Sequence, residues 1–174
     1  MRLDRDKRRF RGAISVGTMA AIVISVTAAC SSSPSSSATT APNASASKAE
    51  ISKSYQTLFN MSDKSVAPKV AVVQDGKSLQ SAFSAELSSP LAAEASGAKV
   101  DSVQILSSVG CKAEFLPSPC ASVSYEIVLP AMSTGNLTGL KGFAVYQGGK
   151  WLVSKQTICA LFTLASNNVA PKGC

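Results

Sequence analysis

Four cysteines in the second half of the chain are the residues whose spacing suggests chemistry most directly: Cys111, Cys120, Cys159 and Cys174. The chain has no C-x-x-C motif and no histidine, so structural disulfides are favoured over a redox or metal site. Four cysteines allow three pairings. We favour Cys111 with Cys120, because they flank a proline-containing connection between two predicted strands. The remaining pair, Cys159 with Cys174, then joins the C-terminal tail to the last predicted helix.

The side chains that could form a ligand pocket or a proton-transfer site are few. With no histidine, a Ser-His-Asp site, a Cys-His site and a histidine-ligated metal are excluded. Asp101 and Tyr125 lie on the apolar faces of predicted strands, and some enzymes use an acid and a tyrosine together in a cavity. Tyr146 and Trp151 lie on either side of Gly148-Gly149. These four are the pocket candidates, but we expect packing or solvated roles and predict no enzyme, no cofactor and no metal.

The first 29 residues have the pattern of a bacterial export signal that ends at a cysteine. Six of the first eleven residues are Lys or Arg, and residues 13–29 are uncharged and rich in Ala, Val and Ile. The end of this stretch, Val26-Thr27-Ala28-Ala29-Cys30, resembles the lipobox of bacterial lipoproteins, whose cysteine is lipidated and becomes the mature N-terminus. We predict a signal peptide over 1–29 and a lipid anchor on Cys30. An uncleaved anchor, or cleavage near Ala29 by ordinary signal peptidase, remains open.

Most of the positive charge belongs to that export signal. The whole chain carries +7, whereas residues 30–174 contain 11 Lys, no Arg and 8 acidic residues, a net charge of +3. Arginine is the side chain best suited to bidentate phosphate recognition, so nucleic acid is not an expected partner. The expected partners are the membrane, through the lipid on Cys30, and a protein or envelope component. The expected location is the outer face of the cytoplasmic membrane.

A tether separates the lipid anchor from the predicted domain. Residues 31–47 are mostly Ser, Thr, Ala and Pro and have no large apolar side chain to bury. We therefore predict a disordered tether over 30–47, whose ends as a flexible coil lie about 20–25 Å apart. A single domain is then expected over 48–174.

The predicted domain begins with helices. Apolar residues at helical spacing predict a helix over 49–60 and another over 79–87, with Ser78 as its cap. The same spacing predicts a short C-terminal helix over 158–165.

Between these helices the hydrophobic period changes to two, which is typical of strands. The alternation predicts strands over 100–109 and 121–129. Strands over 140–147 and 150–153 are joined by Gly148-Gly149, a two-residue hairpin turn that needs positive φ. The predicted fold class is α+β: N-terminal helices packed on a curved antiparallel sheet of about four strands, with a short C-terminal helix.

Several segments resemble a known family. Gly149-Lys150-Trp151-Leu152-Val153-Ser154, followed by Cys159-Ala160-Leu161, looks like the closing segment of actinobacterial secreted proteins and lipoproteins related to the mycobacterial low-molecular-weight antigen. Residues 70–76, 100–109 and 122–129 are similar to the same pattern, so the resemblance covers residues 48–174. It implies a cone-shaped fold like that of nuclear transport factor 2 or cystatin, and a secreted or cell-envelope antigen. It brings no catalytic residues.

Three functional hypotheses follow. The sequence favours a lipid-anchored, non-enzymatic module that binds a protein partner or an envelope component. The second hypothesis is a carrier that holds a small apolar ligand inside the cone, and the third is an isomerase-like enzyme. A cavity of several hundred Å³ favours the second or the third hypothesis, and a buried Asp101 facing that cavity favours the third.

Overall fold

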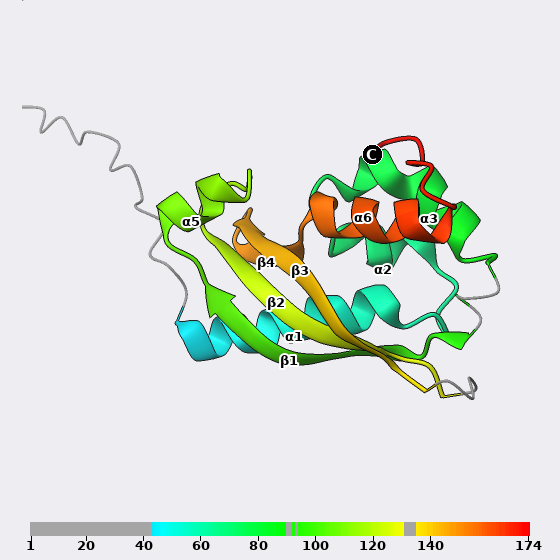
Figure 1. Cartoon of the computed structure of the whole chain (residues 1–174), viewed down its shortest axis with the longest axis horizontal. Coiled ribbons are helices and arrows are strands. Elements are labelled where there is room, and N and C mark those ends of the chain that lie inside the picture. The colour runs from blue at the N-terminus through cyan, green and yellow to red at the C-terminus, as the bar shows by residue number, and fades with distance from the viewer. Residues whose placement is uncertain (1–42, 90–91, 93, 131–134) are drawn as a thin grey trace, which may run out of the picture. The chain divides into compact units, whose positions relative to one another are not determined.

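The computed structural model describes residues 43–89, 92, 94–130 and 135–174. The predicted signal peptide, the predicted lipidation site Cys30 and most of the predicted tether lie outside the described residues. The elements in chain order are α1 (Ala44–Phe59), α2 (Val66–Ala71), the 3-10 helix η1 (Gly76–Leu79), α3 (Gln80–Glu86), β1 (Gly97–Ile105), α5 (Ser108–Ala113), β2 (Cys120–Val128), β3 (Leu137–Gln147), β4 (Lys150–Val153) and α6 (Lys155–Ala165) (Figure 1).

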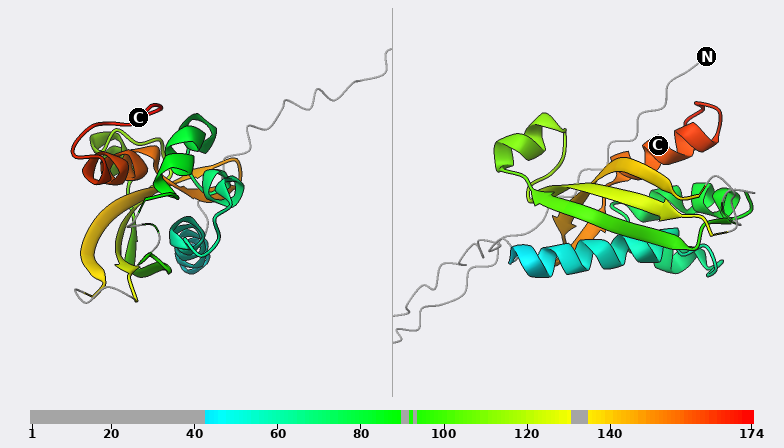
Figure 2. Two further views of the ribbon diagram at one scale, coloured as in Figure 1. Left: turned by 90° about the vertical axis from the view of Figure 1, so that its right-hand side faces the viewer. Right: turned by 60° about the horizontal axis from the view of Figure 1, so that its bottom comes forward.

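The four strands form one antiparallel sheet in the order β1-β2-β3-β4, as the sequence predicts. The sheet curls into a half-barrel, and α1 runs along its open side (Figure 2). Two hydroxyls of α1 bond the backbone of the far strands: Ser54 donates to the carbonyl of Trp151 at 2.9 Å, and Tyr55 to that of Phe143 at 3.2 Å. Helices and sheet thus share one core, which confirms the α+β class.

The centre of this core comes from the two elements with the clearest hydrophobic patterns. The predicted inward face of the second strand is buried at every position: Ala121, Val123, Tyr125, Ile127 and Leu129. From α1, Ile51, Tyr55 and Leu58 are buried, and the ring centroid of Tyr55 lies 4.8 Å from that of Tyr125. The side chains that alternate along β2 and those spaced one helical turn apart in α1 therefore pack together in one aromatic core.

The turn between β3 and β4 also follows the prediction. Gly148 and Gly149 have φ values of 59° and 79°, in the region where only glycine is unstrained, and Gln147 pairs with Lys150 across the turn. The outer edge of β4 is covered, because the backbone N–H of Val153 donates to Val72 and its carbonyl accepts from Gln74, each at 2.9 Å. A covered edge cannot template pairing with another chain.

Helix α1 begins earlier than predicted. It starts at Ala44, after Asn43, whose side-chain oxygen accepts the backbone N–H of Ser45 at 2.9 Å. Ser47, predicted to lie in the tether, is fully buried. An asparagine N-cap followed by small residues is sufficient to start a helix that is then held by packing, which composition alone does not reveal. The ordered domain therefore includes residues 43–47.

The first strand differs from its prediction at both ends. It runs from Gly97 to Ile105 instead of over 100–109, and residues 108–113 form α5. The hydroxyl of Ser107 accepts the backbone N–H of Gly110 at 3.1 Å and caps this helix. A local cap therefore overrides the alternating pattern that predicted a longer strand.

Candidate functional site

Asp101 lies on the solvent side of the sheet. The pairing register of β1 shifts between Val100 and Ser102, which makes Asp101 the extra residue of a β-bulge. Its side chain is 45% exposed, and its carboxylate lies 3.4 Å from the ammonium of Lys99. The predicted apolar face of this strand is therefore wrong at Asp101, because the bulge turns that side chain outward.

Tyr125 is a core residue. Its ring packs against the rings of Tyr55 and Phe59, with centroids 4.8 and 5.7 Å away. Burial raises the pKa of Tyr125 to about 12, so its hydroxyl is protonated at neutral pH. Among the described residues this hydroxyl has no hydrogen-bond partner. Tyr125 therefore packs against the ring of Phe59 inside the core and presents no ionised group.

Tyr146 and Trp151 face each other across the β3–β4 hairpin. They are register partners, and their ring centroids lie 5.4 Å apart. Trp151 is only 2% exposed, whereas Tyr146 is half-buried. The indole therefore packs in the core and offers no open ligand platform.

A partly open apolar cavity of about 300 Å³ lies near the C-terminal end of α1. Its walls come from α1, α3, α6, residues 92 and 95, and the ends of β2 and β3 that meet there. The described lining residues are Leu58, Phe59, Met61, Phe83, Glu86, Ala92, Ala95, Ile127, Leu137, Leu140, Ile158, Leu161, Phe162, Leu164 and Ala165. Glu86 is the one charged side chain among them. The four sequence candidates, Asp101, Tyr125, Tyr146 and Trp151, do not line this cavity.

Aromatic side chains contribute to the walls of the cavity. Phe83 from α3 and Phe162 from α6 meet edge to face, with centroids 5.1 Å apart. Phe59 lines the cavity on one side and stacks on Tyr125 on the other. Two lining residues, Leu137 and Leu164, remain 39% and 70% exposed. The cavity therefore combines buried aromatic walls with an apolar rim that reaches solvent.

A second groove is larger in volume but differs in character. It measures about 590 Å³, is more open, and runs over α2 and η1 beside Lys150 and Leu152. Its lining includes the charged side chains of Asp75, Lys77 and Lys150. The ammonium of Lys150 bridges it by donating to the carbonyl of Ala71 at 3.0 Å. An open groove with charged side chains in its lining offers less apolar burial than the cavity at the end of α1.

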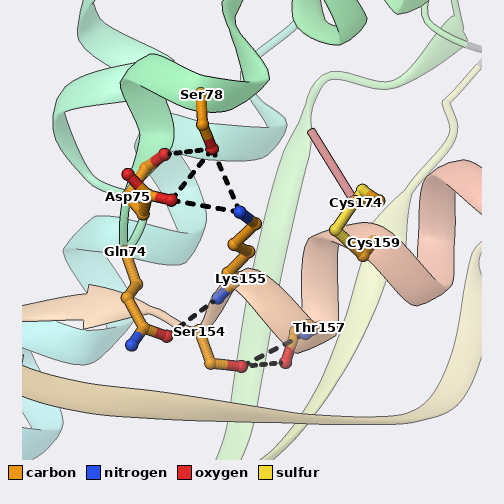
Figure 3. The surroundings of a disulfide bond; sticks show 8 residues. All are labelled: Gln74, Asp75, Ser78, Ser154, Lys155, Thr157, Cys159 and Cys174. Carbon is orange, nitrogen blue, oxygen red and sulfur yellow. Dashed lines mark hydrogen bonds and ion pairs between the residues drawn. A yellow bond between two sulfur atoms is a disulfide. The ribbon is translucent and has the colours of Figure 1, made fainter. Parts of the chain in front are cut away.

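The wall formed by α6 is positioned by a buried polar cap. The hydroxyl of Ser154 accepts the backbone N–H of Thr157 at 3.2 Å and lies 2.9 Å from its hydroxyl (Figure 3). The Thr157 hydroxyl in turn accepts the backbone N–H of Phe143 in β3 at 2.8 Å. This cap therefore locks the start of α6 to the sheet.

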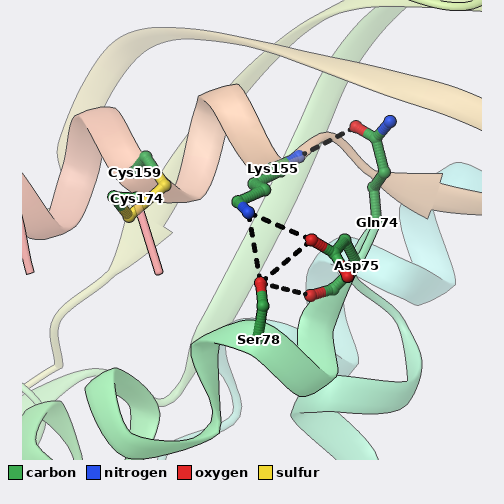
Figure 4. A network of polar contacts seen from close by, with 6 residues as sticks. All are labelled: Gln74, Asp75, Ser78, Lys155, Cys159 and Cys174. Atoms are coloured by element: carbon green, nitrogen blue, oxygen red, sulfur yellow. Dashed lines mark hydrogen bonds and ion pairs between the residues drawn. A yellow bond between two sulfur atoms is a disulfide. The ribbon is translucent and has the colours of Figure 1, made fainter. Parts of the chain in front are cut away.

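A surface network holds the same end of α6 to the segment before α3. Lys155 donates through its ammonium to Asp75 at 3.0 Å and to Ser78 at 3.1 Å, and its backbone N–H donates to Gln74 at 3.2 Å (Figure 4). Ser78 was predicted to cap the helix over 79–87. Its hydroxyl instead donates to the backbone carbonyl of Asp75, and α3 has no side-chain cap. The network therefore aligns α3 and α6, which both contribute to the cavity wall.

Both disulfides form in the pairing that the sequence favours. Cys159 in α6 is bonded to Cys174, which ties the C-terminal tail to the cavity wall (Figure 3). Cys111 in α5 is bonded to Cys120 at the start of β2. Disulfides are typical of proteins that fold in oxidising, extracytoplasmic compartments.

Two features are absent from the described part of the chain. No group of three or more His, Cys, Asp or Glu side chains there could hold a metal ion. None of the helices described there is long and apolar enough to cross a bilayer.

The sequence offered a cavity in the cone only as one hypothesis and identified none of its lining residues, because each wall has an ordinary core pattern. Phe83 in α3 and Phe162 in α6 lie far apart in the chain, and each fits a helical apolar stripe. The one available signal was Leu164, an apolar residue outside the buried stripe of α6, which is 70% exposed in the structure.

Comparison with known proteins gives one match. The family described as low molecular weight antigen MTB12, C-terminal domain, matches residues 44–169, and this match begins at the first residue of α1. Neither a search of curated proteins nor a search of solved structures found a match to the chain. The antigen family and the two disulfides together indicate an extracytoplasmic protein. Because the match spans well over half of the chain, the protein belongs to the family of the low molecular weight antigen MTB12, C-terminal domain.

Proposed function

We propose that this protein is a lipid-anchored, non-enzymatic carrier of the cell envelope that holds a small apolar ligand in the cavity between α1, α3 and α6. The observation that carries this proposal is the cavity of about 300 Å³ with a single charged side chain, Glu86, among its described lining residues. Ligand pockets are mostly apolar concavities of about 300–1,000 Å³, and this cavity is at the lower end of that range.

The cavity dimensions suggest the class of ligand. An engineered protein cavity of about 150 Å³ binds benzene. A cavity of about 300 Å³ suits a molecule about twice that size, such as a fused two-ring compound or a short acyl chain. Glu86 is half-buried, and its carboxylate accepts a hydrogen bond from Ser89 at 3.0 Å. A negative group at the rim disfavours anionic ligands, so the expected ligand is neutral or cationic at its polar end.

The arrangement of titratable groups supports a non-enzymatic role. General acid–base catalysis needs a proton donor or acceptor within hydrogen-bond reach of the reacting atom. Asp101 is on the solvent side of the sheet and Tyr125 lies behind Phe59, so the two residues of the isomerase-like hypothesis do not meet.

The relation to known cone-shaped folds is part of the proposal. A helix along the open side of a curled four-stranded sheet supports the predicted likeness to nuclear transport factor 2 or cystatin. In such a cone the wide end is where a ligand cavity is expected, and here the cavity lies at one end of the sheet.

The lipid anchor on Cys30 is the second part of the proposal, supported by the lipobox-like sequence and the extracytoplasmic family. Cys30→Ala is expected to release the protein from the membrane fraction, because the acyl chains are the attachment. The measurement is fractionation of cells that produce either form, with lipid on the Cys30 peptide scored by mass. Equal membrane association of the two forms argues against the anchor.

Ligand binding is tested with N-phenyl-1-naphthylamine, a neutral apolar fluorophore of two ring systems. The unaltered protein is expected to bind it with enhanced emission. Leu161→Trp fills the cavity from α6 and should weaken binding about tenfold or more, equivalent to about 1.4 kcal/mol. Val169→Trp is the control, since Val169 is 67% exposed and does not line the cavity.

The cavity proposal fails under either of two results. One is absence of probe binding by the unaltered protein. The other is unchanged binding by a Leu161→Trp protein whose urea unfolding midpoint matches that of Val169→Trp.

A further inference from the structure

Phe115 occupies a backbone position where helices usually have glycine. The N–H of Phe115 donates to the carbonyl of Lys112 at 3.1 Å, and the N–H of Leu116 to that of Cys111 at 2.9 Å. This is the Schellman pattern that ends a helix, and Phe115 is the residue in the left-handed conformation, with φ 56°. A bulky residue there is a conformational outlier.

The side chain of Phe115 makes little contact with the rest of the domain that would offset this unfavourable backbone conformation. It is 94% exposed, the highest exposure among the large apolar residues of the described chain. Strained positions that persist without benefit to the fold point to a function. Phe115→Gly is expected to raise the urea unfolding midpoint, because glycine adopts this conformation without strain.

Two other exposed apolar residues lie close to Phe115 in the chain. Val109 is 76% exposed and Ile105 36%, so half of the six large apolar residues exposed in the described chain lie within residues 105–115. We call Ile105, Val109 and Phe115 the apolar tip. The other three exposed residues, Leu137, Leu164 and Val169, belong to other segments.

The base of the tip is held by a small core. The disulfide between Cys111 and Cys120 is buried together with Leu116, Val145 and Leu152. The helix that carries the tip is therefore fixed to the sheet, and the tip needs no folding step to present its side chains.

The tip lies at the end of the domain where the chain enters from the lipid anchor. In Figures 1 and 2, α5 and the N-terminal end of α1 lie at the same end of the sheet, whereas the end of α6 lies toward the other. Cys30 precedes Asn43 by 13 positions, so the two residues can be at most about 45 Å apart. A lipid on Cys30 therefore keeps this end of the domain close to the bilayer.

We propose that the apolar tip inserts into the headgroup–acyl boundary of the membrane that holds the anchor. The proposal rests on the proposed lipid anchor and goes beyond it by giving the domain one orientation. Apolar side chains lie a few ångströms below the headgroups when a peripheral segment binds a bilayer. The charged neighbours of the tip, Lys112 and Glu114, are exposed, and their opposite charges cancel. Apolar contact with the acyl chains is therefore the interaction that holds the tip in the membrane. The ligand cavity then faces away from the membrane.

The test uses the lipidated mature chain, reconstituted in phosphatidylcholine vesicles with or without bromine on the acyl chains. Phe115→Trp places a reporter on the tip, and the native Trp151 is buried and contributes equally in every variant. We expect brominated lipid to quench the added emission by about half or more. Val169→Trp, with comparable exposure after the end of α6, should show little quenching.

Equal quenching of the two variants overturns the orientation. A Phe115→Trp signal that changes only when native envelope protein is added assigns the tip to a protein partner and also overturns the lipid assignment. Failure of the anchor is a distinct result: the chain lacks lipid on Cys30 and stays in solution whatever residue occupies position 115, which removes the basis for both proposals.

Discussion

Replacing Gly142 with alanine is expected to lower the free energy of unfolding by about 3 kcal/mol. A Cβ at this position in β3 would lie 2.7 Å from both the Tyr55 hydroxyl and Cγ2 of Thr157. Neither neighbour can withdraw cheaply, because Tyr55 is fully buried and donates to Phe143, and Thr157 is fixed by the cap of α6. The free-energy costs of overpacking and of losing the Tyr55 hydrogen bond therefore add.

The control is Gly97→Ala in β1. A Cβ at Gly97 meets no atom within 4 Å, so this change should alter stability by less than about 0.5 kcal/mol. Urea unfolding of the two variants and the unaltered protein is the measurement. Equal urea unfolding midpoints for Gly142→Ala and Gly97→Ala would mean that the close approach of α1 and α6 to β3 does not contribute to stability.

Removing the Cys159–Cys174 disulfide, by alanine at both positions, is expected to cost about 3 kcal/mol, the chain-entropy value for a loop of 15 residues. The loss should also reduce probe binding, since α6 contributes five of the residues that line the cavity. The tail also packs against η1, because a Cβ on Gly173 would overlap the backbone carbonyl of Ser78.

The matched control removes the other disulfide, Cys111–Cys120, which closes a loop with a sequence separation of 9. Its loss should cost a similar amount, because loop length enters the entropy only logarithmically. It lies in the separate small core, so probe affinity should not change. The measurements are the urea unfolding midpoints and the probe affinities of both double variants. If the Cys159–Cys174 variant kept full probe affinity, the tail would have no part in shaping the cavity.

Elements with one dominant period could be predicted from the sequence. Residues 121–129 alternate without interruption and α1 keeps Ile51, Tyr55 and Leu58 on one face, so burial of both followed directly. Gly148-Gly149 specified its hairpin because its φ values suit few other residues. The disulfide pairing followed from expected strand adjacency.

The errors arose where a local feature overrides the period. The bulge at Asp101 reversed the side of the strand on which its carboxylate lies, and the cap at Ser107 converted a predicted strand end into α5. Apart from the exposed Leu164, the cavity had no local signal, because its shape depends on how far α3 and α6 stand from the sheet. That distance is set by long-range contacts such as Lys155 with Asp75.

The most direct test of the carrier proposal is methyl NMR of the protein during titration with N-phenyl-1-naphthylamine. The proposal predicts saturable shifts of the methyl groups of Ile127, Leu140 and Ile158, which line the cavity. It predicts unchanged methyl groups of Val66 and Val70, which line the open groove over α2. Shifts confined to Val66 and Val70, or no saturable shift at any of these residues, would contradict it.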